Sequence, residues 1–246
     1  MLYAVRANTA DAIEIARQHF EQLQLHAGSF VVTHVKDGRV IRLSYIKECE
    51  YISELLIPEF NIGKQANSEL CLVASSAQTY YRVATDCILC TSYYGLMNFE
   101  QVYAELIERN IEIPDIRPEL LLLELVATIY ETDAEYSLEK LTDKLIEIAK
   151  KRSLTPTSIV IPVLQIRECC SNLYLIVISA NQQENLFIST AKGIAEILYV
   201  PNELLEYPYI RKIVENYKQI TIKPGTALTT RLGQEEVWYS LTKLQE

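Results

Sequence analysis

The pattern of apolar and polar positions is clearest in the middle of the chain, over residues 118–152. The first half of this segment reads PELLLLELVATIY and is apolar on nearly all sides, so it predicts a helix that other parts of the chain must cover. The second half places Leu138, Leu141 and Leu145 at steps of three and four, with charged residues between them. This spacing predicts an amphipathic helix packed against the first. We therefore expect a helical block at the centre of the fold.

The N-terminal side of this block has the pattern of strands and a helix. FVVTHVK and RVIRLSYI alternate with period two around Asp37-Gly38, a dipeptide that favours the type I′ turn of a β-hairpin. Asn8 and Asp11 are typical helix-start residues, and Gly28 marks the end of the helix that they predict. Further elements are expected as a strand at 2–5, a short helix at 50–57 and a strand at 70–74. Together they give a β-α-β-β-α-β order, that of a ferredoxin-like unit.

Most of the remaining chain also reads as strands. Residues 79–94 predict one long strand that Gly95 ends, and IVIPVLQI and LYLIVIS predict two buried strands. Pro162 lies inside the first of these two strands and predicts a bulge or an edge at that point. The last predicted elements are a strand in NLFIST, a helix at 191–198, a helix at 202–217 bent near Pro208, and strands at 220–222 and 237–241.

These elements predict an α+β fold with largely antiparallel sheets, from both ends of the chain, packed around the central helical block. The same order divides the chain into an N-terminal α/β lobe at 1–95, a helical block at 96–156 and a C-terminal α/β lobe at 157–246. It also fits one continuous domain, because no Gly/Ser-rich linker separates the three parts.

Composition and charge narrow the class of protein. The 246 residues are 49% hydrophobic and 22% charged, as in a folded globular chain. The net charge of -9 disfavours general affinity for nucleic acids or anionic membranes. The N-terminus lacks a signal-peptide pattern, and no apolar run approaches the ~20 residues that cross a bilayer. We expect a cytoplasmic protein that does not bind membranes.

Several catalytic classes lack their motifs. The sequence has no G-x-G-x-x-G, no G-x-x-x-x-G-K-[ST] and no G-x-S-x-G, which disfavours Rossmann dinucleotide binding, P-loop NTPases and α/β-hydrolases. None of the twelve lysines follows an acidic residue by two positions, as the metal-dependent nuclease pattern requires. A degenerate form of that site would combine Glu59 and Asp86 with Gln165 and Arg167. No cofactor is expected.

Cysteine and histidine give only weak metal signals. Cys87 and Cys90 form the one C-x-x-C, and Cys169 and Cys170 would complete four thiolates for zinc. In a strand, however, positions three apart face opposite sides, so we interpret all six cysteines as reduced and mostly buried. The chain has three histidines, His19, His26 and His34. We interpret them as partly exposed helix and hairpin residues without a metal or acid-base role.

A basic stretch at 207–231 is the signal for nucleic-acid binding. Its cations are Arg211, Lys212, Lys218, Lys223 and Arg231, and Tyr207, Tyr209 and Tyr217 are interleaved with them. Tyrosines could stack on bases while the cations hold phosphates. A solvated helix face with tyrosines turned inward explains the same pattern and is the favoured interpretation.

The sixteen tyrosines suit either strands or a protein interface, and they include the pairs Tyr80-Tyr81 and Tyr93-Tyr94. With catalytic motifs absent, the leading hypothesis is a non-catalytic interaction, assembly or regulatory subunit with a protein partner or a second copy of itself. The first alternative is nucleic-acid binding or processing through 207–231. The second is a metal-dependent enzyme with dispersed carboxylates, drawn from Glu48, Glu50, Glu54 and Asp86.

Overall fold

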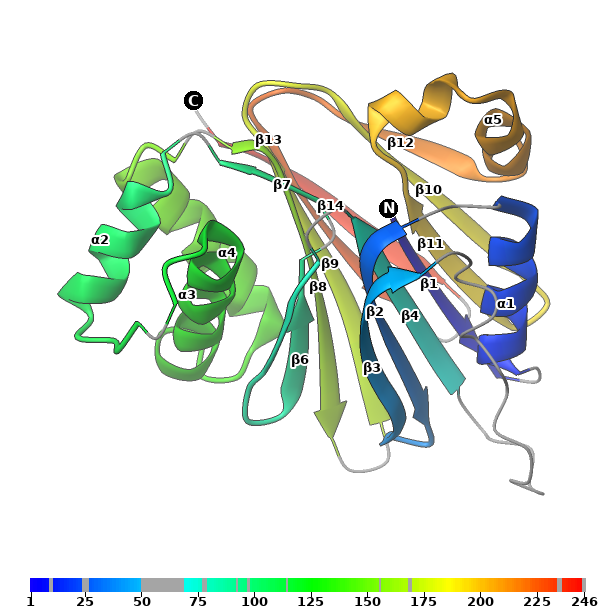
Figure 1. Cartoon of the computed structure of the whole chain (residues 1–246), viewed down its shortest axis with the longest axis horizontal. Helices are drawn as coiled ribbons and strands as arrows, with labels where there is room; N and C mark the ends of the chain where they lie inside the picture. The colour runs from blue at the N-terminus through cyan, green and yellow to red at the C-terminus, as the bar shows by residue number, and fades with distance from the viewer. Residues whose placement is uncertain are drawn as a thin grey trace.

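The chain folds into four layers, in which two antiparallel sheets pack face to face and helices cover both outer sides (Figure 1). The architecture is taken from a computed structural model. It describes residues 1–8, 11–23, 27–49, 69–76, 79–91, 93–96, 98–113, 115–154, 156–167, 170–233 and 236–244. The predicted α+β class with antiparallel sheets is confirmed.

Sheet A combines strands from both ends of the chain. Among the described residues its strand order is β12-β10-β11-β1-β4-β2-β3, and the pairs are antiparallel. Its strands are β1 (Leu2–Ala7), β2 (Ala27–Lys36), β3 (Arg39–Cys49), β4 (Glu69–Ser76), β10 (Glu184–Ala191), β11 (Ile194–Tyr199) and β12 (Lys218–Ile222). Since β1 and β2 both run antiparallel to β4, α1 joins two parallel strands with β4 between them. This is a split β-α-β arrangement, and C-terminal strands extend it on one side.

Sheet B is built from a stretch at residues 81–96 and from strands between residues 156 and 243. Its described strand order is β14-β13-β9-β8-β6-β5, and β7 pairs with β8 as well. Its strands are β5 (Tyr81–Val83), β6 (Cys87–Cys90), β7 (Tyr93–Leu96), β8 (Pro156–Arg167), β9 (Cys170–Ser179), β13 (Thr226–Leu232) and β14 (Val237–Lys243). Each sheet therefore joins an earlier part of the sequence, residues 2–76 in sheet A and 81–96 in sheet B, to strands from the second half of the chain.

The helices form the two outer layers (Figure 1). Sheet A is covered by α1 (Ala12–Leu23), the 3₁₀ helix η2 (Asn202–Glu206) and α5 (Pro208–Val214), and sheet B by α2 (Glu100–Glu108), α3 (Pro118–Thr132) and α4 (Leu138–Lys151). The helical block is thus central in the sequence but lies on the outside of sheet B. None of the described helices combines the length and apolarity that crossing a bilayer requires.

Alternation of side chains explains the apolar strands. In β9, Leu173, Leu175 and Val177 point into the core between the sheets. The alternate residues Tyr174 and Ile176 point toward the helices over sheet B. Because a strand in this position is covered on both faces, nearly every residue is apolar. The two predicted buried strands are β8 and β9, and they pair as an antiparallel hairpin.

Three local sequence signals agree with the structure: the Asp37-Gly38 turn, the helix start at Asp11 and the strand interruption at Pro162. Asp37 and Gly38 have φ of 46° and 74°, the positive values that a type I′ turn requires, and they join β2 to β3. Asp11 Oδ1 accepts the backbone N–H of Ile13 at 3.1 Å and begins α1. Pro162 lies where the partner of β8 changes from β6 to β7, so its missing N–H falls at an interruption of the ladder.

Other local predictions were wrong. Residues 79–94 do not form one strand but fall in β5, β6 and β7, and the predicted helix at 191–198 is largely the strand β11. The first helix ends at Leu23, and Gly28 lies in β2. The apolar residues of β11 pair with both β1 and β10, and these tertiary partners override a pattern that also fits a helix. The predicted helix at 50–57 lies outside the described residues.

Candidate functional site

A cleft of about 980 Å³ lies on the outer side of sheet A, between α1 and the segment that contains α5. Its floor comes from Tyr3 of β1 and Glu196 of β11 with His19 and Tyr217 against them, and its walls come from the rest of α1 and of residues 209–217. The walls carry mostly polar side chains, among them Gln18, Gln22, Lys212 and Asn216. A concave site with converging polar groups is the usual form of a small-molecule site.

The floor of the cleft is a fixed group of four side chains. The hydroxyl groups of Tyr3 and Tyr217 both donate to Glu196 Oε1, at 2.6 Å and 3.0 Å. The imidazole of His19 stacks on the Tyr3 ring with centroids 4.0 Å apart. His19 Nε2 is buried and has no hydrogen-bond partner among the described residues. The floor therefore holds one polar atom whose hydrogen-bonding capacity is unused.

Burial sets the protonation states of these groups. It lowers the pKa of His19 to about 4, so the imidazole is neutral at pH 7. Burial, reinforced by the neighbouring Glu196, raises the pKa of Tyr3 and of Tyr217 well above the ordinary value of tyrosine. Both tyrosines are therefore hydrogen-bond donors at neutral pH. The charged side chains that line the cleft are Glu196, Glu215 and Lys212, which sum to -1.

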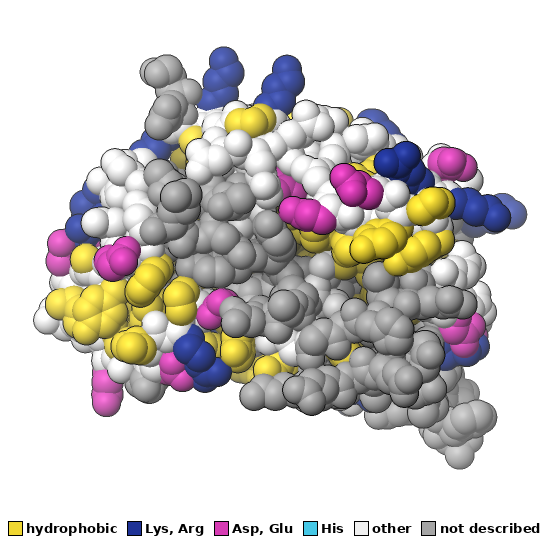
Figure 2. Space-filling view, turned by 45° about the horizontal axis from the view of Figure 1, so that its top comes forward, with side chains coloured by type: hydrophobic (Ala, Val, Ile, Leu, Met, Phe, Trp, Pro, Cys, Tyr) yellow, Lys and Arg dark blue, Asp and Glu magenta, His cyan; other side chains and the backbone are white. Residues whose placement is uncertain are grey.

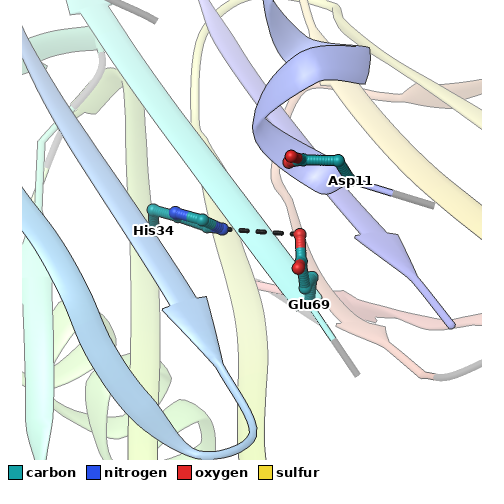
Figure 3. Close-up of side chains that lie close together, drawn as sticks. All are labelled: Asp11, His34 and Glu69. Carbon is teal, nitrogen blue, oxygen red and sulfur yellow. Dashed lines mark ion pairs between the residues drawn. The ribbon is translucent and has the colours of Figure 1, made fainter. Parts of the chain in front are cut away.

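A second cluster lies where α1 begins, and Figure 3 shows it. Asp11 precedes α1, His34 is on β2 and Glu69 begins β4, and one ligand atom from each lies within 4.8 Å of the others. The sequence interpretation of His34 as partly exposed was wrong, because only 6% of its surface is exposed. His26 lies outside the described residues. Sequence reasoning missed the cluster because Asp11 and Glu69 lie 58 positions apart in the sequence.

The cations of the basic stretch do not form one patch. Arg211 and Lys212 are exposed on α5, which covers sheet A, and Lys218 lies 5.5 Å from the centre of the Tyr239 ring. Lys223 is exposed just after β12. Arg231 is on β13 of sheet B and lines a separate cavity with Glu139 of α4. Lys and Arg side chains are scattered around the face shown in Figure 2. Nucleic-acid binding stays a prediction.

The tyrosine pairs differ in what the structure describes. The Tyr80 and Tyr81 rings each lie 6.2 Å from the Tyr45 ring. The Arg117 guanidinium lies 4.9 Å from the centre of the Tyr80 ring and donates to its hydroxyl at 3.1 Å. Tyr93 and Tyr94 are in β7, but their side chains lie outside the described part of the structure. Contact between these tyrosines and a protein partner stays a prediction.

The two cysteines of the C-x-x-C face opposite sides of sheet B, as strand geometry predicts. Cys87 packs toward the helices, and Cys90 lies in the core between the sheets. Burial raises the pKa of each thiol to about 12, so both are protonated at neutral pH. This geometry prevents Cys87 and Cys90 from binding the same ion. Cys169 and the Cys170 side chain are outside the described residues.

Of the predicted carboxylate site, the structure brings together Asp86 and Gln165 around Tyr130. The Tyr130 hydroxyl donates to Asp86 Oδ1 at 2.6 Å and accepts from Gln165 Nε2 at 2.6 Å. Gln165 Nε2 also donates to the Tyr136 carbonyl at 3.1 Å. The other proposed members are outside the described residues or have side chains that are: Glu48, Glu50, Glu54, Glu59 and Arg167. The members that the structure describes, Asp86 and Gln165, belong to a buried hydrogen-bond network that connects α3 to sheet B.

Replacing Tyr130 by phenylalanine is expected to lower the free energy of unfolding by about 1–3 kcal/mol, since it removes a hydroxyl that bonds to both Asp86 and Gln165. Urea unfolding at pH 7 measures this. The matched control is Tyr103→Phe on α2, where the ring is 41% exposed and little change is expected. Equal losses in the two variants would contradict a structural role for the Tyr130 hydroxyl.

Comparison with known proteins identifies no family, since no family model and no curated protein matches the chain. Several solved structures resemble the chain, and two of them match it over its whole length. One is a glutamine phosphoribosylpyrophosphate (PRPP) amidotransferase from B. subtilis complexed with ADP and GMP, with TM-score 0.56 and 9% identity. The other is an allosteric regulatory enzyme of purine biosynthesis, with TM-score 0.56 and 11% identity. The chain spans about half of each, 49%. At such identities the likeness shows the fold alone.

Proposed function

We propose that this protein is a non-catalytic regulatory subunit that binds a small polar molecule in the cleft between α1 and α5. The observation that carries the proposal is His19, which lines a large cleft and whose buried Nε2 has no hydrogen-bond partner among the described residues. A ligand that hydrogen-bonds to this nitrogen would remove the cost of leaving it unpaired. Tyr3, Glu196 and Tyr217 hold the surrounding floor rigid.

The charges of the cleft indicate the class of ligand. The lining side chains sum to -1 and the chain as a whole to -9, which disfavours a polyphosphate. A neutral or cationic molecule with several hydrogen-bonding groups suits the amide and hydroxyl groups of the walls. The His19 ring packs against Tyr3. Within the described residues it makes no hydrogen bond to a hydroxyl or thiol that could act as a nucleophile. This supports binding over catalysis.

The segment around α5 offers a way to couple ligand binding to a protein partner. Its residues Tyr209, Lys212 and Asn216 line the cleft. Tyr207 and Tyr209 in this segment are also exposed, by 48% and 43%. Exposed aromatic side chains are common anchors of protein interfaces. A ligand that orders this segment would change the surface that a partner meets, as in a regulatory subunit.

The test is a thermal-unfolding screen with glutamine, arginine and spermidine as neutral or cationic probes. PRPP, ADP and GMP are added because the similar structures are named for or complexed with them. We expect a probe of the first group to raise the melting temperature, since a ligand at a hundred times its Kd adds about 2.7 kcal/mol to stability. The phosphate-bearing probes are expected to have no effect.

His19→Phe keeps an aromatic ring against Tyr3 but removes Nε2, so it is expected to abolish the shift. Tyr103→Phe, on the opposite side of the molecule, is the matched control and should keep it. Tight binding of a phosphate-bearing probe would contradict the charge argument. Turnover of a bound probe would contradict the non-catalytic proposal, and an unchanged shift in His19→Phe would place the ligand elsewhere.

A further inference from the structure

The outer face of sheet A carries a second polar cluster that does not touch the cleft. Its geometry follows from the pairing of β2 with β4, which places His34 beside Cys71 and Lys36 beside Glu69. His34 and Glu69 are thus diagonal neighbours on one face of the sheet. The first turn of α1 lies over them, because the N–H of Ala12 donates to Glu69 Oε2 at 3.0 Å. Asp11 immediately precedes this turn (Figure 3).

His34 is a buried imidazole without a hydrogen bond. Only 6% of its surface is exposed, and neither ring nitrogen has a hydrogen-bond partner in the part of the chain that the structure describes. Its Nε2 points at Glu69 Oε2 across 3.5 Å, at the outer limit for a hydrogen bond. Two ligands about 2.0–2.1 Å from a tetrahedral ion lie roughly 3.4 Å apart, so this spacing suits two ligands of one ion.

Both carboxylates are held in place by their other contacts. Lys36 Nζ lies 2.9 Å from Glu69 Oε1, and the Ala12 N–H binds Oε2. Asp11 Oδ1 accepts from the backbone N–H of Ile13 at 3.1 Å and of Glu14 at 3.4 Å, which leaves Oδ2 for another ligand. Contacts of this kind orient the ligands of protein metal sites.

We propose that Asp11, His34 and Glu69 bind one divalent transition-metal ion, with Zn²⁺ as the best match and water in the remaining position. Imidazole nitrogen with carboxylate oxygen suits zinc, whereas Mg²⁺ and Ca²⁺ prefer ligand sets made of oxygen alone. The ion offsets the two carboxylate charges and binds the His34 nitrogen, whose present contact with Glu69 is only a long one of 3.5 Å. The Lys36 ammonium and the N-terminus of α1 repel a cation, which lowers the affinity but keeps both carboxylates oriented.

Isothermal titration of the full chain, stripped with chelator and titrated with ZnCl₂, tests the proposal. One Zn²⁺ per chain is expected, with MgCl₂ at least a hundredfold weaker. Asp11→Asn keeps a residue that caps helices, and His34→Leu removes the unpaired imidazole, so both are expected to fold. Each should weaken Zn²⁺ binding at least tenfold. Melting curves without metal check that the variants are folded.

His19→Phe removes a histidine from the other side of α1 and is the matched control, with unchanged zinc binding expected. The proposal is overturned if the wild type does not bind Zn²⁺ or binds Mg²⁺ as tightly. It is also overturned if folded His34→Leu keeps wild-type affinity, since the ion would then sit on other residues. None of these outcomes depends on whether the α1/α5 cleft binds a small molecule.

Discussion

Glu105→Ala is expected to lower the free energy of unfolding by about 3 kcal/mol, because it removes the charge-assisted hydrogen bonds that two arginines make to a buried carboxylate. Glu105 on α2 is 3% exposed, and it accepts from Arg152 Nε at 2.6 Å and from Arg109 Nε at 3.0 Å. Arg152 caps the end of α4, and Arg109 also bonds to Asp133, which caps the end of α3, at 2.8 Å. One carboxylate therefore joins the three helices over sheet B. Urea unfolding at pH 7 measures the loss.

The matched control is Glu108→Ala, one turn along α2. Glu108 also pairs with Arg152, but its side chain is 57% exposed, so a loss below about 1 kcal/mol is expected. Similar losses for the two variants would show that burial of Glu105 does not matter. Burial by itself would raise the pKa of Glu105, but the hydrogen bonds from Arg152 and Arg109 outweigh it and lower the pKa. The stabilisation by Glu105 is therefore present above the unfolded-state pKa and is lost as the pH falls below it.

Acidification is expected to destabilise the protein through His19. Burial lowers the pKa of His19 in the folded protein to about 4, from 6.5. Between these two values the unfolded chain binds a proton that the folded protein does not, so stability falls as the pH falls from 6.5 to 4. A shift of this size corresponds to at most about 3 kcal/mol at full burial. Urea unfolding at several pH values across this window measures the slope.

The comparison that isolates this effect is wild type against His19→Phe. The carboxylates titrate over the same range in both proteins, so the difference between the two profiles reports on His19. We expect the variant to have the flatter profile between pH 6.5 and 4. Parallel profiles would mean that His19 is protonated in the folded protein as readily as in the unfolded chain.

Predictions from sequence succeeded where a short stretch carries the whole physical cause. Asp37-Gly38 supplies the positive φ values of its turn, whatever the hairpin packs against. The C-x-x-C geometry also follows from the strand alone, since residues three apart point to opposite faces. Predictions failed where two structures fit one pattern. The apolar residues of β11 suit a helix or a strand, and pairing with β1 and β10 decides between them.

The amino-acid sequence by itself therefore determined the α+β class, the helices α3 and α4, the β2–β3 hairpin and the buried strands β8 and β9. Only the tertiary structure decided which strands share a sheet and which polar side chains meet. The cleft floor joins Tyr3 and His19 to Glu196 and Tyr217, and the second cluster joins Asp11 to His34 and Glu69. Periodicity and turn residues report contacts within a few positions along the chain. Contacts between distant positions depend instead on strand order and register, which a single sequence leaves open.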